Sequence, residues 1–285
     1  MDGITKSVVS SEVLKPKDFK SAIKPVWCPG CGHFAVLNGV TKAFAALELP
    51  RENIALVSGI GCSSRMPAYA NVYGFHGIHG RAAALGAGIK VARPDLTVVV
   101  AGGDGDGFSI GGNHFIHACR RNVDFTYIVM DNEVYGMTKG QASPTTPSDW
   151  AESKLTPHGP ETRVFQPLAM AFAAGASFIA RGSCGDPNGL ARLIVEAIEH
   201  PGFALVQALS PCPTFVPEQM GWKKLTHEEY PEATSDYTEA VRRIHEDDGF
   251  TTGIFYAEKR EVWPPQRPAR LQAKSVEEMA GEFVL

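Results

Sequence analysis

The chain has 285 residues, of which 44% are hydrophobic and 20% charged, a balance typical of a globular protein with a buried core. Its formal net charge of −4 offers no basic surface for nucleic acid or for an anionic membrane, so neither is expected as a partner. The apolar runs are too short to span a bilayer, and the N-terminus lacks the apolar core of a signal peptide, so we expect a cytoplasmic protein.

Short β-rich runs alternate with amphipathic stretches through the central two-thirds of the chain. In chain order, the sequence predicts helix 33–47, strand 54–58, helix 81–92, strand 96–101, helix 110–121, strand 125–130, helix 166–174, strand 177–181, helix 189–200 and strand 203–209. Most of these strands are continuous Val, Ile, Leu and Ala runs, as expected of parallel strands that are covered on both faces. The order predicts an α/β fold with a doubly wound, mostly parallel sheet, whose ligand lies at the carboxyl ends of the strands.

The two remaining regions are less regular. Residues 140–160 are rich in Ser, Thr and Pro and are predicted to form a long loop of the kind usually kept for function. After Pro213 the alternation fades, and only helix 237–245 is predicted before a Pro-rich segment at 263–268 and a polar tail. We therefore predict an α/β domain over residues 1–213 and an extension over residues 214–285 that wraps the core or a partner.

A glycine-rich segment, residues 102–107 (Gly-Gly-Asp-Gly-Asp-Gly), directly follows the predicted strand 96–101. Asn132 directly follows the next predicted strand. The oxygens of Asp104 and Asn132 can therefore converge on one hard cation such as Mg²⁺ at the end of the sheet. The glycines let the backbone approach a diphosphate closely, and the helix predicted from residue 110 offers its N-terminal N–H groups.

Other interpretations of the glycine-rich segment fit less well. An EF-hand loop needs Asp or Asn where Phe108 stands and Glu where Phe115 stands. A dinucleotide-binding fingerprint needs a third glycine, which both Gly59-Ile-Gly61 and Gly86-Ala-Gly88 lack. A turn without a ligand is the remaining alternative, and four glycines with two aspartates in six residues are hard to explain as a mere connection.

The six cysteines do not form a disulfide framework in a chain of this length, so metal ligands and buried thiols are expected. Cys28-Pro-Gly-Cys31 can nucleate a metal site, whereas a thioredoxin-like dithiol would follow a buried strand, which is not predicted here. Cys62 and Cys212 each follow a predicted strand at the end of the sheet that carries Asp104. Cys119 lies in a predicted helix and is interpreted as a structural thiol, while the role of Cys184 stays open. Spacing alone does not separate zinc from a [4Fe–4S] cluster.

Three segments together carry a family resemblance. Gly103-Asp104-Gly105-Asp106, residues 110–114 (Ile-Gly-Gly-Asn-His) and residues 130–141 (Met-Asp-Asn-Glu-Val-Tyr-Gly-Met-Thr-Lys-Gly-Gln) resemble the β subunit of 2-oxoacid:ferredoxin oxidoreductases. The resemblance covers roughly residues 15–215 and implies a thiamine diphosphate-binding fold of the pyrophosphate type. It further implies that Asp104, Asn132 and the Val134 carbonyl hold Mg²⁺. The residues expected to line the cofactor are Ile60, Gly61, Ser63, His79, Gly103, Gly105, Asp106, Gly136 and Met137, with a histidine satisfied in the core as the alternative for His79.

The same resemblance extends to the cysteines. Trp-Cys-Pro-Gly-Cys-Gly, Gly-Ile-Gly-Cys-Ser and Ser-Pro-Cys match the segments that carry the cluster ligands in this family. It therefore implies a [4Fe–4S] cluster held by Cys28, Cys31, Cys62 and Cys212. Cys62 would lie beside the residues that contact the thiamine cofactor, so the two centres would be adjacent.

The implied activity is oxidative decarboxylation of a 2-oxoacid to acyl-CoA and CO₂, with electrons passed through the cluster to ferredoxin, or the reverse reaction that fixes CO₂. The sequence is most similar to the enzymes that act on 2-oxoglutarate, and pyruvate or a branched-chain oxoacid stays open. No Glu stands in a motif that would activate the thiamine ring, so the resemblance implies that a partner α subunit supplies it. Arg65 and Lys139 are candidate catalytic residues for binding a substrate carboxylate or coenzyme A, and each is equally well an ordinary surface cation.

Two rival functions stay open. One is a thiamine diphosphate-dependent lyase or decarboxylase without a redox cluster, which the four grouped cysteines disfavour. The other is an iron–sulfur electron carrier, which has no need of the Asp104 and Asn132 pair.

Overall fold

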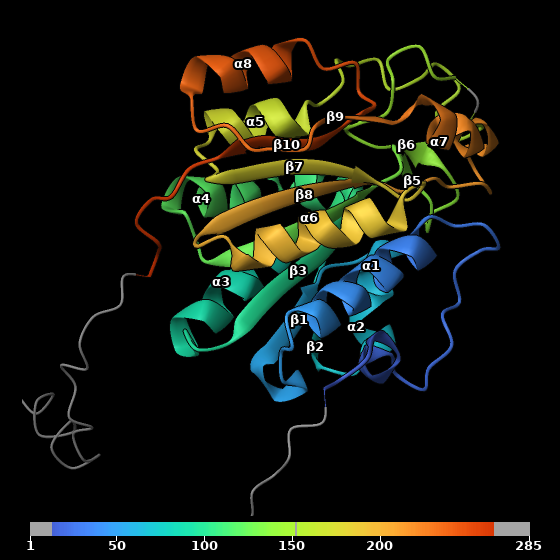
Figure 1. Ribbon diagram of the computed structural model, residues 1–285. Coiled ribbons are helices and arrows are strands. Elements are labelled where there is room, and N and C mark those ends of the chain that lie inside the picture. The colour runs from blue at the N-terminus through green and yellow to red at the C-terminus, as the bar shows by residue number, and fades with distance from the viewer. Residues whose placement is uncertain (1–12, 152, 265–285) are drawn as a thin grey trace, which may run out of the picture.

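The computed structural model describes residues 13–151 and 153–264, and its centre is an eight-stranded sheet with the strand order β2-β1-β3-β4-β8-β7-β10-β9 (Figure 1). The strands of this sheet are β1 (Ile54–Ser58), β2 (Tyr73–His76), β3 (Thr97–Gly103), β4 (Phe125–Asp131), β7 (Phe178–Ser183), β8 (Phe203–Leu209), β9 (His227–Tyr230) and β10 (Thr251–Ala257). A separate two-stranded ribbon pairs β5 (Val134–Tyr135) with β6 (Gln141–Ala142).

The longer helices are α1 (His33–Ala46), α3 (Ala82–Ala92), α4 (Gly112–Arg121), α5 (Pro167–Ala173), α6 (Pro187–Glu199) and α8 (Tyr237–His245), and α2 (Met66–Tyr69) and α7 (Trp222–Leu225) are single turns. Short 3₁₀ turns occupy Pro16–Phe19, Arg51–Asn53, Ser63–Arg65 and Pro217–Gly221, and a π-helical turn occupies Gly105–Ile110. None of the helices within the described residues has the length and apolar character needed to cross a bilayer.

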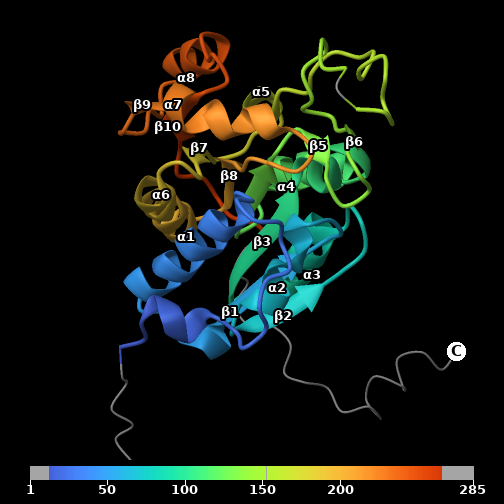
Figure 2. The ribbon, with the colours of Figure 1, turned by 90° about the vertical axis from the view of Figure 1, so that its right-hand side faces the viewer.

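The helices cover both faces of the sheet because alternate residues of each buried strand point to opposite sides. On β3, Val99 and Ala101 pack in one hydrophobic cluster with α1 and α6, whereas Val98 and Val100 pack in a second cluster with α3, α4 and α5. Figure 2 shows α1 and α6 on one side of the strands and α3 and α4 on the other. The predicted doubly wound, mostly parallel sheet is therefore confirmed.

The connections around β1 determine where a ligand can bind. Strand β1 pairs in parallel with β2 on one side and with β3 on the other, so successive connections leave it in opposite directions. In an open α/β sheet, the carboxyl ends of two strands that flank such a switch in direction form a crevice. Here this crevice lies between the loop that follows β1 and the glycine-rich segment that follows β3.

All five predicted strands and all six predicted helices are present, with ends that shift by a few residues. The largest shift is at the helix predicted over 110–121: α4 begins at Gly112, and the π-helical turn Gly105–Ile110 precedes it. This turn is tight, because a Cβ at Gly111 would lie 2.3 Å from the Asp106 carbonyl oxygen. Helical backbone therefore starts directly after Asp104, closer to the crevice than predicted.

The sheet continues beyond residue 213, which the sequence did not predict. Strand β10 pairs antiparallel with β7, and β9 pairs parallel with β10 at the outer edge. Much of the predicted extension thus adds to the sheet instead of wrapping around it, while the division at residue 213 stays a prediction. The last part of the extension, residues 265–285, lies outside the described residues.

Candidate functional site

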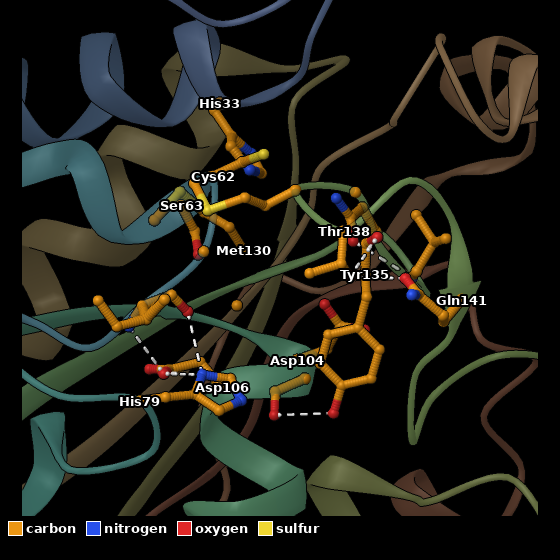
Figure 3. A pocket seen from close by; sticks show the side chains of 18 residues that line it. His33, Cys62, Ser63, His79, Asp104, Asp106, Met130, Tyr135, Thr138 and Gln141 are labelled. Atoms are coloured by element: carbon orange, nitrogen blue, oxygen red, sulfur yellow. Dashed lines mark hydrogen bonds and ion pairs between the residues drawn. The ribbon is translucent and has the colours of Figure 1, made fainter.

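A cavity of about 400 Å³ opens at the carboxyl ends of β1, β3 and β4 (Figure 3). Its walls include every residue that the sequence assigned to Mg²⁺ or to the thiamine cofactor: Ile60, Gly61, Ser63, His79, Gly103, Asp104, Gly105, Asp106, Asn132, Val134, Gly136 and Met137. Five further residues line the cavity and were assigned no role: His33, Met130, Tyr135, Thr138 and Gln141. The switch in the direction of the connections thus brings five separate chain segments to one space.

Gly105 allows the backbone to form the floor of this cavity. The Tyr135 ring packs directly against it, and a Cβ at this position would lie 2.2 Å from the ring. The Tyr135 hydroxyl donates a hydrogen bond to the Gly105 carbonyl oxygen at 3.3 Å, which Figure 3 shows beside Asp104. The glycine therefore lets an aromatic side chain and the backbone of the turn meet at the cavity.

Asp106 ties three segments of the cavity wall together. Its Oδ1 accepts hydrogen bonds from the N–H groups of Ile60 at 2.9 Å and Gly80 at 2.7 Å. The same oxygen lies 2.9 Å from Nδ1 of His79 (Figure 3). The His79 side chain is 37% exposed, which fits a cavity wall better than a histidine satisfied in the core. The second carboxylate oxygen of Asp106, Oδ2, is buried and has no hydrogen-bond partner among the described residues.

Three carboxyl groups gather at and behind the cavity wall: buried Asp104 and Asp131, and half-buried Glu133. Asp104 is 2% exposed, and burial, followed by the charge of Asp131, raises its pKa to about 7. Burial likewise raises the pKa of Asp131, and burial with these two neighbours raises the pKa of Glu133 to about 8. Such a group of negative charges in a site shielded from water favours a bound cation.

The donor atoms at this point suit magnesium. Asp104, Asn132 and Val134 all line the cavity, so a carboxylate, a side-chain amide and a backbone carbonyl are available together. Hard oxygen donors of this kind are the ligands that Mg²⁺ takes in proteins, with phosphate and water completing its shell. The residues present therefore fit a magnesium ion with a bound diphosphate.

Thr145 reaches this site from the loop predicted to be functional. Its hydroxyl lies 3.0 Å from Oδ2 of Asp104 and 2.8 Å from Oδ1 of Asp131. Because a hydroxyl carries one proton, it donates to only one of the two carboxylates at a time. The Ser- and Thr-rich composition of the loop was the signal for a polar role, and the sequence did not indicate this particular residue.

A second cavity, of about 170 Å³, adjoins the first and is lined by Cys28, Cys31, Cys62 and Cys212. The Sγ atoms of Cys212 and Cys62 lie 3.6 Å and 3.9 Å from the position that a Cβ at Gly136 would take. Burial, with added contributions from the other three thiols, raises the pKa of Cys31 to about 12. The four cysteines predicted as cluster ligands thus line one cavity, which fits thiolate ligation of an iron–sulfur cluster.

Within the described part of the chain, no three His, Cys, Asp or Glu side chains are placed to hold a single metal ion.

The two cavities share a wall. His33, Cys62, Asn132, Gly136 and Met137 line both of them. His33 follows the Cys-x-x-Cys segment directly, is 1% exposed, and lies with Nδ1 2.7 Å from the Ser210 hydroxyl. Burial lowers the pKa of His33 to about 4, so the ring between the two cavities is neutral near pH 7.

The remaining cysteines and the two candidate catalytic residues lie apart from this shared wall. The Cys184 thiol donates to the Gly32 carbonyl oxygen at 3.1 Å and does not line the sulfur cavity, and Cys119 is buried in the core. Arg65 lines the sulfur cavity and donates to the Tyr69 hydroxyl at 2.9 Å. Lys139 is exposed and lines neither cavity.

Comparisons with known proteins agree with this geometry. Residues 59–208 match the family described as thiamine pyrophosphate enzyme, C-terminal TPP binding domain. The chain is 49% identical over 201 residues to the 2-oxoglutarate oxidoreductase subunit KorB of Mycobacterium tuberculosis, covering 70% of this chain and 54% of that protein. It is 47% identical over 189 residues to the 2-oxoglutarate synthase subunit KorB of Archaeoglobus fulgidus, covering 66% of this chain and 70% of that protein.

One solved structure is similar over nearly the whole fold. A 2-oxoglutarate:ferredoxin oxidoreductase chain from Magnetococcus marinus, solved with 2-oxoglutarate, coenzyme A and succinyl-CoA bound, superposes with a TM-score of 0.84. It is 44% identical, and the match covers 88% of this chain and 87% of that chain.

Proposed function

Because this chain belongs to the family of 2-oxoacid:ferredoxin oxidoreductase β subunits, we propose that it is the thiamine diphosphate-binding subunit of such an enzyme. The reaction is the oxidative decarboxylation of a 2-oxoacid, with 2-oxoglutarate as the first candidate, to acyl-CoA and CO₂. The two electrons pass to ferredoxin, and the reverse reaction would fix CO₂. Activity and substrate are proposals, since the chain spans only 54% to 64% of the length of three of the curated relatives that it matches.

The observation that supports this proposal best is the shared wall between the two cavities. One cavity offers oxygen donors and a glycine-rich backbone, and the other offers four thiols. A lyase has no use for the thiols, and an electron carrier has no use for the oxygen donors. An enzyme that removes electrons from its substrate needs both within a short distance.

On this proposal, Asp104, Asn132 and the Val134 carbonyl hold Mg²⁺, and the glycine-rich turn receives the diphosphate. Thiamine diphosphate, when bound, supplies a carbon nucleophile for the ketone and an electron sink for the pair left by CO₂. Asp106 holds the Ile60 and Gly80 backbone and the His79 ring in fixed positions on the cavity wall. Neutral His33 and Cys62 form the wall between this space and the sulfur cavity. The cluster ligands on this proposal are Cys28, Cys31, Cys62 and Cys212.

The chain also requires a partner on this proposal. Among the described residues, no Glu lines the cavity, so the Glu that activates the thiamine ring comes from an α subunit. Coenzyme A, ferredoxin and the 2-oxoacid complete the set of partners. Arg65 beside the sulfur cavity and exposed Lys139 are the candidates for binding a substrate carboxylate or coenzyme A. A cytoplasmic location belongs to the same proposal, and six free thiols suit a reducing compartment.

The test is purification of the full chain without oxygen, followed by measurement of iron, acid-labile sulfide and zinc, and by EPR after reduction. We expect about four irons and four sulfides per chain, together with binding of Mg²⁺ and thiamine diphosphate measured by calorimetry. Cys28→Ser should lose the EPR signal, and Cys184→Ser should retain it, because the Cys184 thiol lies outside the sulfur cavity.

Two results would contradict the proposal. Zinc, or no metal, with thiamine diphosphate still bound would favour the lyase. A cluster without any binding of thiamine diphosphate would favour the electron carrier. Turnover by the isolated chain equal to that of the mixed subunits would refute the need for an α subunit.

A further inference from the structure

Gln219 hydrogen-bonds the backbone of two cavity-lining residues from a part of the chain that no motif singles out. It lies in the 3₁₀ turn Pro217–Gly221, beyond the predicted α/β domain, and is 1% exposed. A buried amide of this kind is costly unless both of its ends are hydrogen-bonded. Where its two bonds go therefore indicates what the side chain does.

Both bonds go to the backbone of site loops. The Gln219 side-chain nitrogen donates to the Asn132 carbonyl oxygen at 2.8 Å. Its side-chain oxygen accepts from the Cys212 backbone N–H at 2.9 Å. The orientation of the amide is unambiguous, because a carbonyl only accepts and a backbone N–H only donates.

Few other hydrogen bonds join these two loops to each other. They follow β4 and β8, which are parallel neighbours whose ladder ends at the pair Asp131 and Leu209. One more backbone bond, from the Ser210 N–H to the Asp131 carbonyl oxygen at 2.8 Å, follows the ladder. Beyond this bond, the segment after β4 leads to the proposed magnesium donors Asn132 and Val134, whereas the segment after β8 leads to Cys212. The planar amide of Gln219 spans the gap between them.

The local backbone holds Gln219 in this position. The Val216 N–H donates to the Cys212 carbonyl oxygen at 2.9 Å, and the Gln219 N–H donates to the Val216 carbonyl oxygen at 3.1 Å. The turn after Cys212 is therefore closed on itself, and its one buried amide points back at Asn132. A shift of either loop by a fraction of an ångström strains both bonds of the same side chain.

Resting on the proposed function, we propose that Gln219 is a positioning residue that couples the two cofactor sites of this chain. It fixes the distance between the loop that holds Mg²⁺ and thiamine diphosphate and the loop that supplies the cluster ligand Cys212. Binding at the first site therefore alters the surroundings of the second. Gln219 touches neither cofactor and acts through the Asn132 and Cys212 backbone.

The experiment uses the full chain with its partner subunit, prepared without oxygen. Cluster EPR and midpoint potential are recorded before and after addition of Mg²⁺ and thiamine diphosphate, and cofactor affinity is measured by calorimetry. In the wild type, cofactor binding should shift both cluster signals. In Gln219→Met, which keeps the length of the side chain and removes both hydrogen bonds, the shift should vanish and cofactor affinity should fall about tenfold, with iron content unchanged.

A second variant separates the effects of the two hydrogen bonds. Gln219→Glu keeps an oxygen for the Cys212 N–H but loses the donor to Asn132, and it adds a carboxylate close to Glu133. We expect cofactor affinity to fall as in Gln219→Met, while the g-values of the cofactor-free cluster match the wild type. Met220→Leu, an exposed neighbour in the same turn, is the control and should change neither signal.

The possible failures are distinguishable. A wild type that holds no cluster or binds no thiamine diphosphate overturns the proposed function, and the inference with it. A wild type with both centres but no shift on cofactor binding overturns the coupling alone. So does a Gln219→Met variant whose affinity and shift equal those of the wild type, even if it melts at a lower temperature, because that result is the signature of a purely structural role.

Discussion

Polar side chains at the carboxyl and amino ends of the sheet differ in how they are hydrogen-bonded. At the amino end, Asn122 accepts from the Ser177 hydroxyl at 2.6 Å and from the Phe203 N–H at 2.8 Å, and donates to the Glu261 carbonyl oxygen at 3.0 Å. Ser177 also lies 2.8 Å from Nε2 of His200. Every polar atom of Asn122 is thus satisfied within the chain.

At the carboxyl end, side chains of the same chemical kind lie close together. The carboxyl groups of buried Asp104 and Asp131 and of half-buried Glu133 lie near one another, and the four cysteines line the second cavity. Arg181, whose charge acts on Asp131 and Glu133, is held in a buried pair with Asp247 at 2.5 Å. At the amino end the hydrogen bonds within the chain are therefore sufficient for stability, whereas at the carboxyl end the grouping of like groups suits the cations and cofactor of the proposed function.

The largest expected effect comes from Asp104→Asn. Outer partners of metal ligands typically contribute 10–100-fold to metal affinity, so loss of a ligand should weaken binding of Mg²⁺ and thiamine diphosphate by more than about 100-fold. The same substitution should raise the melting temperature of the metal-free chain at pH 8 by a few degrees, since it removes a buried charge. Calorimetric titration and thermal melts measure the two effects.

The gain in stability should depend on pH in a defined direction. The pKa of Asp104 is raised from 3.8 to about 7, so the cost of its charge is absent below pH 4 and complete above pH 7. The advantage of Asp104→Asn should therefore be largest at pH 8 and vanish near pH 4. Asp149→Asn, an exposed change in the neighbouring loop, is the matched control. A variant less stable than the wild type at pH 8 would break the contrast between the two ends of the sheet.

The next effect concerns the amino end. Asn122→Ala removes the acceptor of the Phe203 N–H and of the Ser177 hydroxyl. It also leaves alanine at a left-handed φ of 52°, which asparagine adopts more readily than alanine does. We expect the free energy of unfolding to fall by about 3 kcal/mol. Asn122→Gly should lose about 1 kcal/mol less, because glycine adopts this φ without strain. Urea unfolding measures both.

For both Asn122 variants, iron content and thiamine diphosphate affinity should equal those of the wild type in the folded population. A tenfold loss of affinity in either one would mean that the two ends of the sheet are not separate in function.

The smallest effect concerns His200. Burial lowers its pKa from 6.5 to about 4, so its neutral form is favoured in the folded chain. Because the folded pKa is depressed, this contribution to stability is present above pH 6.5 and is lost as the pH falls toward 4. Between pH 7 and pH 5 the wild type should lose about 2 °C more in melting temperature than His200→Gln. Exposed His245→Gln should follow the wild type, and equal slopes for all three proteins would show that His200 is not the cause.

The sequence predicted the central strands and the long helices because each is a continuous apolar run or an amphipathic stretch that folds in only one way. It did not predict β2, β9 and β10. The residues of β2 are all exposed, and three of the four residues of β9, His227–Tyr230, are exposed too, so neither carries an apolar pattern. Such strands are decided by the free hydrogen-bonding edge of a neighbouring strand, which is a property of the assembled sheet.

The residues of the candidate site also divide into those that the sequence predicted and those that it did not. Asp104, Asn132 and the cysteines were predicted because metal and diphosphate chemistry requires those residue types directly after strands or at close spacing. Thr145 and Gln219 lie in segments with no motif, and they act through hydrogen bonds to groups 41 and 87 positions away in the chain. Residue types and apolar runs along the chain were thus enough to predict the candidate donor residues and the segments that form the central strands. The family resemblance implied that the two centres would be adjacent, but the residues of their shared wall, such as His33 and Gly136, followed only from the folded chain. They depend on which strand ends meet where the connections between strands change direction.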